Sequence, residues 1–284
     1  MRHAVRGITG LAALALLAGT AAAQGAKPLK HCPADSVVSG TVCMDSYEAS
    51  VWRVPNPTTT NKILVSKIQQ GKATVANLVA GGARQLGIGS TDDYAPCADS
   101  GQNCADDIYA VSLPAVHPAA NITWFQAQAA CRNARKRLPS NAEWQAAVVG
   151  TPDPGPDNST TDCNTGSVFA AVNTGSRSSC TSSDGAFDMV GNLSEWVASW
   201  LPRSTTCGTW SPGVSPTGDG QCLAGAAPGD FDVVDEPAAL LRGGDFRSGT
   251  LAGPLDVEGR LALSFPAPNV IPAPGVVIGF RCAR

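Results

Sequence analysis

Short apolar runs, separated by glycine, proline and polar residues, make up most of this chain. Residues 32–56 are interpreted as two short strands that meet at Ser39 and Gly40. Further apolar strand signals lie at 239–244 and 276–284, near the C-terminus. This pattern predicts short strands joined by turns.

Helix-start signals occur at two places in the middle of the chain. Thr123 stands three residues before Gln126, and Ser140 stands three residues before Glu143. This is the spacing of a capping box, in which each side chain bonds the other residue's backbone amide. We therefore expect two helices that begin just after Thr123 and Ser140. A third, short helix is expected near residues 73–79.

Long polar segments separate these elements. Residues 150–183 and 201–230 are rich in Ser, Thr, Gly, Pro and Asp and are expected to be loops, while 57–114 carries few regular signals. A loop as long as the first needs a crosslink, which a bond between Cys163 and Cys180 would supply.

The segment 184–200 follows neither a strand nor a helix period. It places Asp188 and Glu195 among large apolar side chains, with Gly191 and Asn192 between them. Carboxylates are costly to bury without partners. Two interpretations stay open at this point: a cation held by loop oxygens, or a buried hydrogen-bond network.

Composition excludes some classes of function. The 284 residues carry a net charge of −3 and no Lys/Arg-rich run, so nothing indicates nucleic-acid binding. No linker or internal repeat divides the chain. Residues 1–23 read as a signal peptide, because two arginines precede a short apolar run and a small-residue cleavage site. No later segment is long and apolar enough to span a membrane, so we expect a secreted or periplasmic protein.

The ten cysteines agree with export. An even number in an exported chain predicts five disulfides, whereas zinc would favour tight Cys pairs or histidine partners. After the signal peptide only His31 and His117 remain. This scarcity argues against most Ser-His-Asp, Cys-His and His-metal schemes.

Four segments in order resemble the formylglycine-generating enzyme, or sulfatase-modifying factor, family. They are "NITWFQAQAACRNARKRLPSNAEWQAA" from Asn121, "FDMVGNLSEW" from Phe187, "LLRGGDF" from Leu240 and "GFRCAR" from Gly279. "MDSYEASVW" from Met44 is similar to that family's opening strand. The resemblance implies one domain over 32–284. It also implies an α+β class: a compact, loop-rich, C-type-lectin-like fold with two helices and short antiparallel strands.

The resemblance also implies a calcium site in the 184–200 segment. Asp188 and Glu195 would supply side-chain oxygens, and Gly191 and Leu193 would supply backbone carbonyls, which are ligands that calcium accepts. A second family site would lie in the 160s to 170s, with Asn164 as a possible member. The competing interpretation is that Asp188 and Glu195 cap turns and bond backbone amides without a metal.

The chain departs from the family at its catalytic centre. Family enzymes resemble one another in a copper-binding pair of cysteines five residues apart, just after the "RGG" strand. Here those positions fall at about Ser248 and Gly253, and no cysteine lies between Cys222 and Cys282. Neither serine nor glycine replaces a thiolate, so copper is not expected.

The resemblance implies that Cys131 bonds Cys282. The other eight cysteines pair as sequence neighbours, which predicts the bonds Cys32–Cys43, Cys97–Cys104, Cys163–Cys180 and Cys207–Cys222. An exchange of partners between the last two loops is the competing arrangement. No free thiol would then remain.

Two functions stay open. One is a non-catalytic, calcium-stabilised binding module whose ligand is a protein, a peptide or a glycan. The other is an enzyme of the same family that acts on a peptide or protein substrate without the cysteine pair. Its polar groups would be Arg242, Asp245 and Arg247, which could equally form salt bridges within the fold.

Overall fold

The computed structural model describes residues 29–88, 94–153, 155, 157–202, 206–224, 237–261 and 277–284. The predicted signal peptide, residues 1–23, lies outside the described residues. No helix in these ranges is both long enough and apolar enough to cross a membrane.

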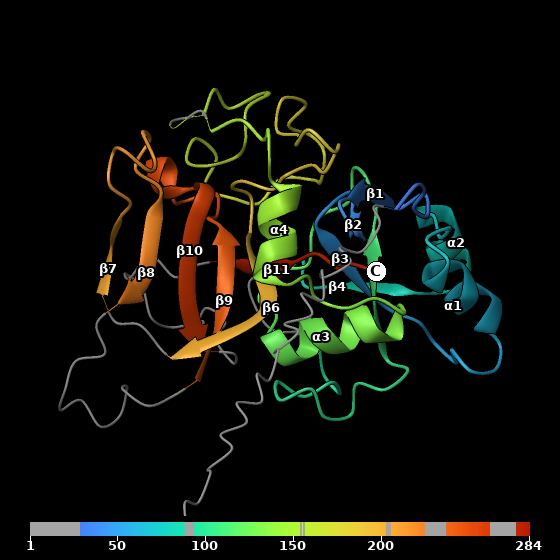
Figure 1. The fold of residues 1–284 in the computed structure, drawn as a ribbon. Helices are drawn as coiled ribbons and strands as arrows, with labels where there is room; N and C mark the ends of the chain where they lie inside the picture. Colours follow the sequence, from blue (N-terminus) through green and yellow to red (C-terminus); the bar gives the residue numbers. More distant parts are fainter. Residues whose placement is uncertain are drawn as a thin grey trace, which may run out of the picture.

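The N-terminal part forms two small antiparallel sheets (Figure 1). The predicted hairpin is present, with β1 (Ser36–Ser39) paired to β2 (Val42–Asp45). A second sheet places β3 (Ala49–Arg53) between β4 (Arg84–Leu86) and β5 (Ile108–Ser112). Both of its outer strands lie in the segment where the sequence carried few regular signals.

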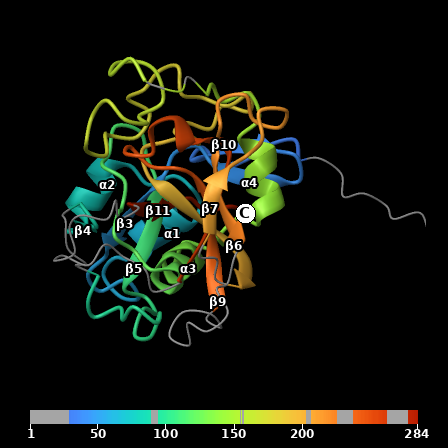
Figure 2. The same cartoon turned by 90° about the vertical axis from the view of Figure 1, so that its left-hand side faces the viewer.

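A six-stranded sheet forms the other half of the domain, in the order β11-β6-β9-β10-β8-β7. In that order its strands are Ile278–Phe280, Ser194–Pro202, Pro237–Gly243, Gly253–Leu261, Gly220–Ala224 and Thr206–Thr209. The β7 edge faces the viewer in Figure 2.

Two features of this sheet correct the expectations. The 201–230 segment, expected to be loop, contains β7 and β8. Two of the strand pairs, β11 with β6 and β8 with β10, are parallel rather than antiparallel. Parallel neighbours need long connections, so local turn signals do not reveal them.

The helices α3 (Trp124–Asn133) and α4 (Asn141–Ala147) confirm both predicted capping boxes. The short helix expected near 73–79 is α2 (Val75–Ala80). The sequence did not predict α1 (Lys62–Gln69), which has no side-chain cap and buries only Leu64 and Ile68. A single-turn 3₁₀ helix, Gly249–Leu251, precedes β10.

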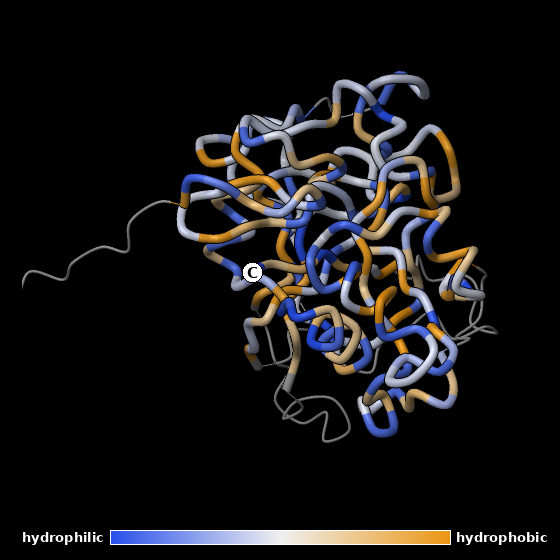
Figure 3. The backbone as a smooth tube through the Cα atoms, turned by 90° about the vertical axis from the view of Figure 1, so that its right-hand side faces the viewer, coloured by the Kyte–Doolittle hydropathy of each residue, from blue (hydrophilic) through white to orange (hydrophobic). Residues whose placement is uncertain are grey.

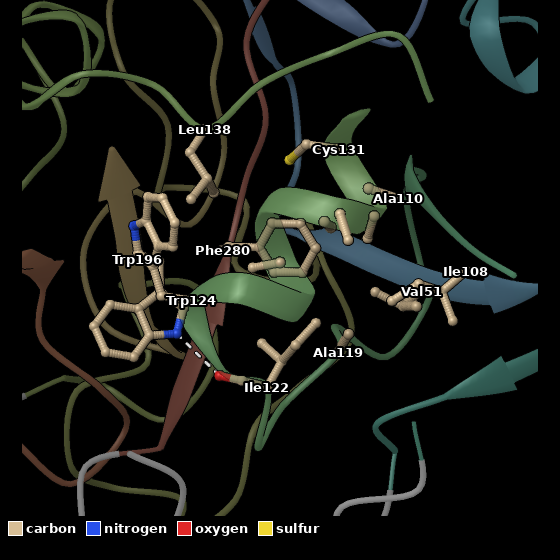
Figure 4. Close-up of a cluster of buried hydrophobic side chains, with 14 of the residues drawn as sticks. Val51, Ile108, Ala110, Ala119, Ile122, Trp124, Cys131, Leu138, Trp196 and Phe280 are labelled. Carbon is tan, nitrogen blue, oxygen red and sulfur yellow. Dashed lines mark hydrogen bonds between the residues drawn. The ribbon is translucent and has the colours of Figure 1, made fainter. Parts of the chain in front are cut away.

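The main core joins the two halves of the domain. Trp196 of β6 and Phe280 of β11 lie beside α3, and the Trp196 Nε1 donates to the Ile122 carbonyl oxygen at 2.9 Å (Figure 4). Cys131 and Cys282 form a disulfide in the same cluster. Hydrophobic stretches are short and interrupted along the described part of the chain (Figure 3), as the loop-rich pattern predicts.

All ten cysteines are in disulfides, in the five predicted pairs. The bonds are Cys32–Cys43, Cys97–Cys104, Cys131–Cys282, Cys163–Cys180 and Cys207–Cys222. The competing exchange of partners does not occur. Such bonds are typical of proteins outside the reducing cytoplasm.

Candidate functional site

The 187–195 segment is a tight turn that leads into β6. Asp188, Gly191 and Asn192 all have positive φ, at 56°, 72° and 59°. A side chain at Gly191 would overlap the Asn164 carbonyl oxygen. The Asn192 amide donates to that same carbonyl at 2.8 Å. A glycine is therefore required because the 160s loop packs directly against the backbone of this turn.

Glu195 is paired with a buried arginine. The Arg281 Nε lies 2.8 Å from each Glu195 carboxylate oxygen, and Nη2 lies 2.6 Å from Oε1. The Trp144 Nε1 donates to Glu195 Oε2 at 2.7 Å. Arg281 Nη2 also donates to the Phe187 and Asp188 carbonyl oxygens. A guanidinium thus supplies the positive charge at the centre of this turn.

A third carboxylate, Glu48, completes the network. It is fully buried and accepts hydrogen bonds from Asn192 Nδ2 at 2.5 Å and from the Leu193 amide at 3.0 Å. Asp188 Oδ2 accepts from the Gly175 amide at 2.6 Å. Burial raises the pKa of Asp188 to about 6 and the pKa of Glu48 well above its usual range.

The side chains of Asp188 and Glu195, two of the four predicted calcium ligands, are engaged in hydrogen bonds in this geometry. Both oxygens of Glu195 already accept hydrogen bonds, and Arg281 is bound to the Asp188 carbonyl. Within the described ranges, no three Asp, Glu, His or Cys side chains come together as a metal site. The hydrogen-bond network accounts for Asp188 and Glu195 without a metal, while calcium binding by the chain stays a prediction.

Asn164, the possible member of a second calcium site, belongs to the same network. Its Nδ2 donates to Asn192 Oδ1 at 3.1 Å and to the Ala170 carbonyl oxygen at 3.0 Å. The side chain therefore ties the 160s loop to the 187–195 turn.

Ser248 and Gly253 occupy the two positions where the family resemblance places the thiol pair. Ser248 lies in the turn after β9, where its Oγ accepts from the Asp245 amide at 2.9 Å. A side chain at Gly253 would overlap the Asp219 carboxylate. That carboxylate is fixed, because the Leu255 amide donates to it at 2.7 Å and Ser215 Oγ at 2.6 Å. These residues do not fit a thiolate-bound copper ion.

A cavity of about 280 Å³ lies next to Ser248. Strands β7, β8 and β10 form one side of it, and residues 245–251 form the other. Its apolar surface comes from Leu251 and from the Cys207–Cys222 disulfide. We call this cavity the Ser248 pocket.

Two ion pairs line the Ser248 pocket. Arg247 Nη2 lies 3.4 Å from Asp245 Oδ2, and Arg260 Nη2 lies 2.8 Å from Glu258 Oε2. Burial raises the pKa of Asp245, although the Val277 and Arg247 amides donate to its carboxylate.

The polar groups predicted from the sequence are divided between two places. Asp245 and Arg247 meet in the Ser248 pocket, whereas Arg242 stacks on the Trp144 ring at 4.7 Å and donates to the Pro254 carbonyl oxygen. Burial lowers the pKa of Arg242 to about 10.

Several residues of these sites carried no local sequence signal. They are Glu48, Asp219, Glu258, Arg260 and Arg281. Glu48 and Arg281 reach their partners only through the packing of distant segments, and Asp219 meets the Leu255 amide in the same way, whereas Glu258 and Arg260 pair two residues apart on β10.

A family model and several known proteins match this chain in whole or in part. The family model described as a sulfatase-modifying factor enzyme 1-like domain matches residues 36–284. A segment of 92 residues is 34% identical to the serine/threonine-protein kinase Pkn1 of Chlamydia trachomatis serovar L2, and it covers 30% of this chain and 14% of the kinase. The Pkn1 of Chlamydia caviae is 33% identical over 88 residues, with the same coverage of 30% and 14%. The chain thus matches only a small part of these relatives.

Among solved structures, the Major Tropism Determinant I1 variant is similar with 16% identity and a TM-score of 0.46, covering 90% of this chain and 54% of that one. CarF is similar with 19% identity and a TM-score of 0.31, covering 59% and 67%. At these sequence identities and TM-scores, the solved structures support no inference about the function of this chain. The fold is α+β and loop-rich, as expected, and the family match spans most of the sequence. The chain belongs to the sulfatase-modifying factor enzyme 1-like domain family.

Proposed function

We propose that this chain is an exported, non-catalytic binding module of its family, and that its ligand enters the Ser248 pocket. The observation that carries the proposal is the Asp219 carboxylate, which fills the space that a side chain at Gly253 would need. The second thiol of a copper-binding pair therefore has no room at Gly253 beside this carboxylate.

The bonding of all ten cysteines in disulfides supports a non-catalytic function. All ten are bonded in pairs, so no thiol is left to take over the missing role. The same five bonds fit a protein that works outside the cytoplasm. A stabilising calcium ion is not required by the proposal, because Arg281 already neutralises Glu195.

The alternative, an enzyme that works without the cysteine pair, needs a general base or a nucleophile in the pocket. Asp245 is the most buried carboxylate there, but both of its oxygens accept backbone amide hydrogen bonds. The described residues that line the pocket include no histidine, lysine or tyrosine. The lining therefore favours binding over catalysis.

The proposal is tested by two assays on the mature chain. A sulfatase-type cysteine peptide is incubated with the protein and copper and followed by mass spectrometry; we expect no aldehyde product. Immobilised glycans and peptides are then probed with the wild type and with Arg247→Gln. We expect a bound ligand that the variant loses, while Arg137→Gln, a change in an exposed ion pair, retains it.

Time-dependent loss of the peptide thiol together with gain of an aldehyde would refute the proposal. Ligand binding that is the same in wild type and Arg247→Gln would place the ligand elsewhere and refute the assignment of the Ser248 pocket.

A further inference from the structure

We infer that the Ser248 pocket binds a small zwitterion, with the ligand's anionic group on Arg247 and its cationic group on Glu258. This inference rests on the proposed binding function and names the chemical class of the ligand. It follows from the hydrogen-bonding groups that the pocket leaves unfilled and from the balance of its charges.

Arg247 is held in place but incompletely paired. Its guanidinium lies over the Phe246 ring, 5.3 Å from the centroid, and its Nη2 is 3.4 Å from Asp245. That distance is longer than the 2.7–2.9 Å or so of a strong charge-assisted hydrogen bond. The Nε is buried without a hydrogen-bond partner among the described residues. The side chain as a whole is 30% exposed, so an incoming carboxylate can reach the guanidinium from the pocket and give it a closer acceptor.

Glu258 offers the complementary group. Its Oε2 accepts from Arg260 Nε at 2.9 Å and lies 2.8 Å from Arg260 Nη2. Its Oε1 has no hydrogen-bond partner in the part of the chain that the structure describes. The side chain is 19% exposed, so a ligand ammonium can reach this oxygen. One oxygen of the Glu258 carboxylate thus orients Arg260, and the other can accept a hydrogen bond from a ligand.

The balance of charges selects a ligand that carries both signs. Arg247 and Arg260 are matched by Asp245 and Glu258, so the pocket is neutral in sum. An anion alone would approach two carboxylates, and a cation alone would approach two guanidinium groups. A zwitterion places each of its charges against the opposite charge and adds no net charge to the site.

Size and apolar surface narrow the class further. The cavity of about 280 Å³ is slightly smaller than the roughly 300 Å³ at the lower end of ordinary ligand pockets. Gly208 and Gly220 present no side chain to the cavity, and Leu251 supplies apolar contact. These features suit a free amino acid with a short aliphatic side chain.

The test is calorimetric titration of the folded, disulfide-bonded chain with L-alanine, L-valine and L-leucine. Each is paired with its N-acetylated and its C-amidated analogue, which lack one charge. We expect saturable binding of at least one free amino acid. Removal of either charge should weaken binding by about 10-fold or more, as expected for loss of a charged hydrogen bond.

Variants assign the two ends of the ligand. Arg247→Gln should weaken binding of the free amino acid by about 10- to 100-fold and should remove the penalty for C-amidation. Glu258→Gln should have the same effect on affinity and should remove the penalty for N-acetylation. Arg137→Gln, in an exposed ion pair with Glu143, serves as the matched control and should bind like the wild type. Unchanged melting temperatures show that the variants are folded.

Two results would overturn the inference. One is equal binding of the free amino acids and both capped analogues. The other is no binding of any zwitterion by a protein that still binds an arrayed ligand through Arg247; in that case the proposed binding function stands and only the ligand class is wrong. Aldehyde formation in the peptide assay refutes the proposed function itself.

Discussion

Replacing Arg281 by methionine should destabilise the fold more than any surface charge change. Arg281 is completely buried, and its partner Glu195 is 1% exposed. The guanidinium also donates to the main-chain carbonyl oxygens of Asp45, Phe187 and Asp188 at 3.1, 2.8 and 3.3 Å. Methionine fills part of the volume but leaves a buried carboxylate and three carbonyls without this donor.

The expected magnitude follows from the cost of an uncompensated buried charge. Removing one partner of a buried ion pair costs about 3–5 kcal/mol of unfolding free energy. In a domain of this size each kcal/mol lowers Tm by about 2–4 °C, so the loss in Arg281→Met is about 6–20 °C. An exposed pair contributes at most about 1 kcal/mol, so Arg137→Met should shift Tm little.

The assay is urea and thermal unfolding of wild type, Arg281→Met, Glu195→Gln and the double variant. If the two side chains act as a pair, the double variant should lose less than the sum of the single variants. A loss of less than about 1 kcal/mol in Arg281→Met, as for an exposed pair, would refute the argument. So would full additivity of the two single changes.

Three further predictions concern other parts of the fold. If the hydrogen-bond network holds Glu195 without a metal, the wild type should melt at the same temperature in calcium and in chelator; an occupied calcium site at 100 times its dissociation constant would instead add about 2.7 kcal/mol. Burial acts to raise the pKa of Asp35, but the Lys136 ammonium and the Arg284 guanidinium together outweigh it and lower the pKa from 3.8 to about 2. This contribution to stability is present above pH 3.8 and is lost as the pH falls through about 2, so acid unfolding curves should be flatter in this range for Asp35→Asn than for wild type. Replacing both Cys131 and Cys282, which are 151 residues apart, should cost roughly 5 kcal/mol, more than removing the disulfide whose partners are 7 residues apart; equal losses would contradict the chain-entropy argument.

Helices and strands whose ends are set by residues close together in the sequence were predictable from the sequence. The helices α3 and α4 begin where Thr123 and Ser140 form capping boxes, because a cap depends only on residues three positions apart. The β1–β2 hairpin follows in the same way from the turn at Gly40. Helix α1 was not predicted because Asn61 makes no side-chain cap, so the sequence carries no start signal for this helix.

The disulfide pairs were predictable for two different reasons. The four local bonds join cysteines that are neighbours in the sequence, so their proximity is nearly imposed by the chain itself. The bond between Cys131 and Cys282 was expected only from the family resemblance. Its partners lie on α3 and just after β11, and only the packed core brings these elements together.

The sequence by itself determined the capped helices α3 and α4, the β1–β2 hairpin, the four local disulfides and the family, because each depends on residue type and short spacing. It marked Asp188 and Glu195 as unusual but left their partner open between a cation and a network. The tertiary structure supplied the partner that the sequence did not reveal, because Arg281 lies 86 residues beyond Glu195 and reaches it only when β11 pairs with β6. It also placed the Asp219 carboxylate against Gly253, a contact set by the folding of distant loops onto one sheet. Which side chains are buried at these two sites, and which groups they contact, depends on the packed domain. The groups that meet there are far apart in the sequence, so no local sequence pattern connects them.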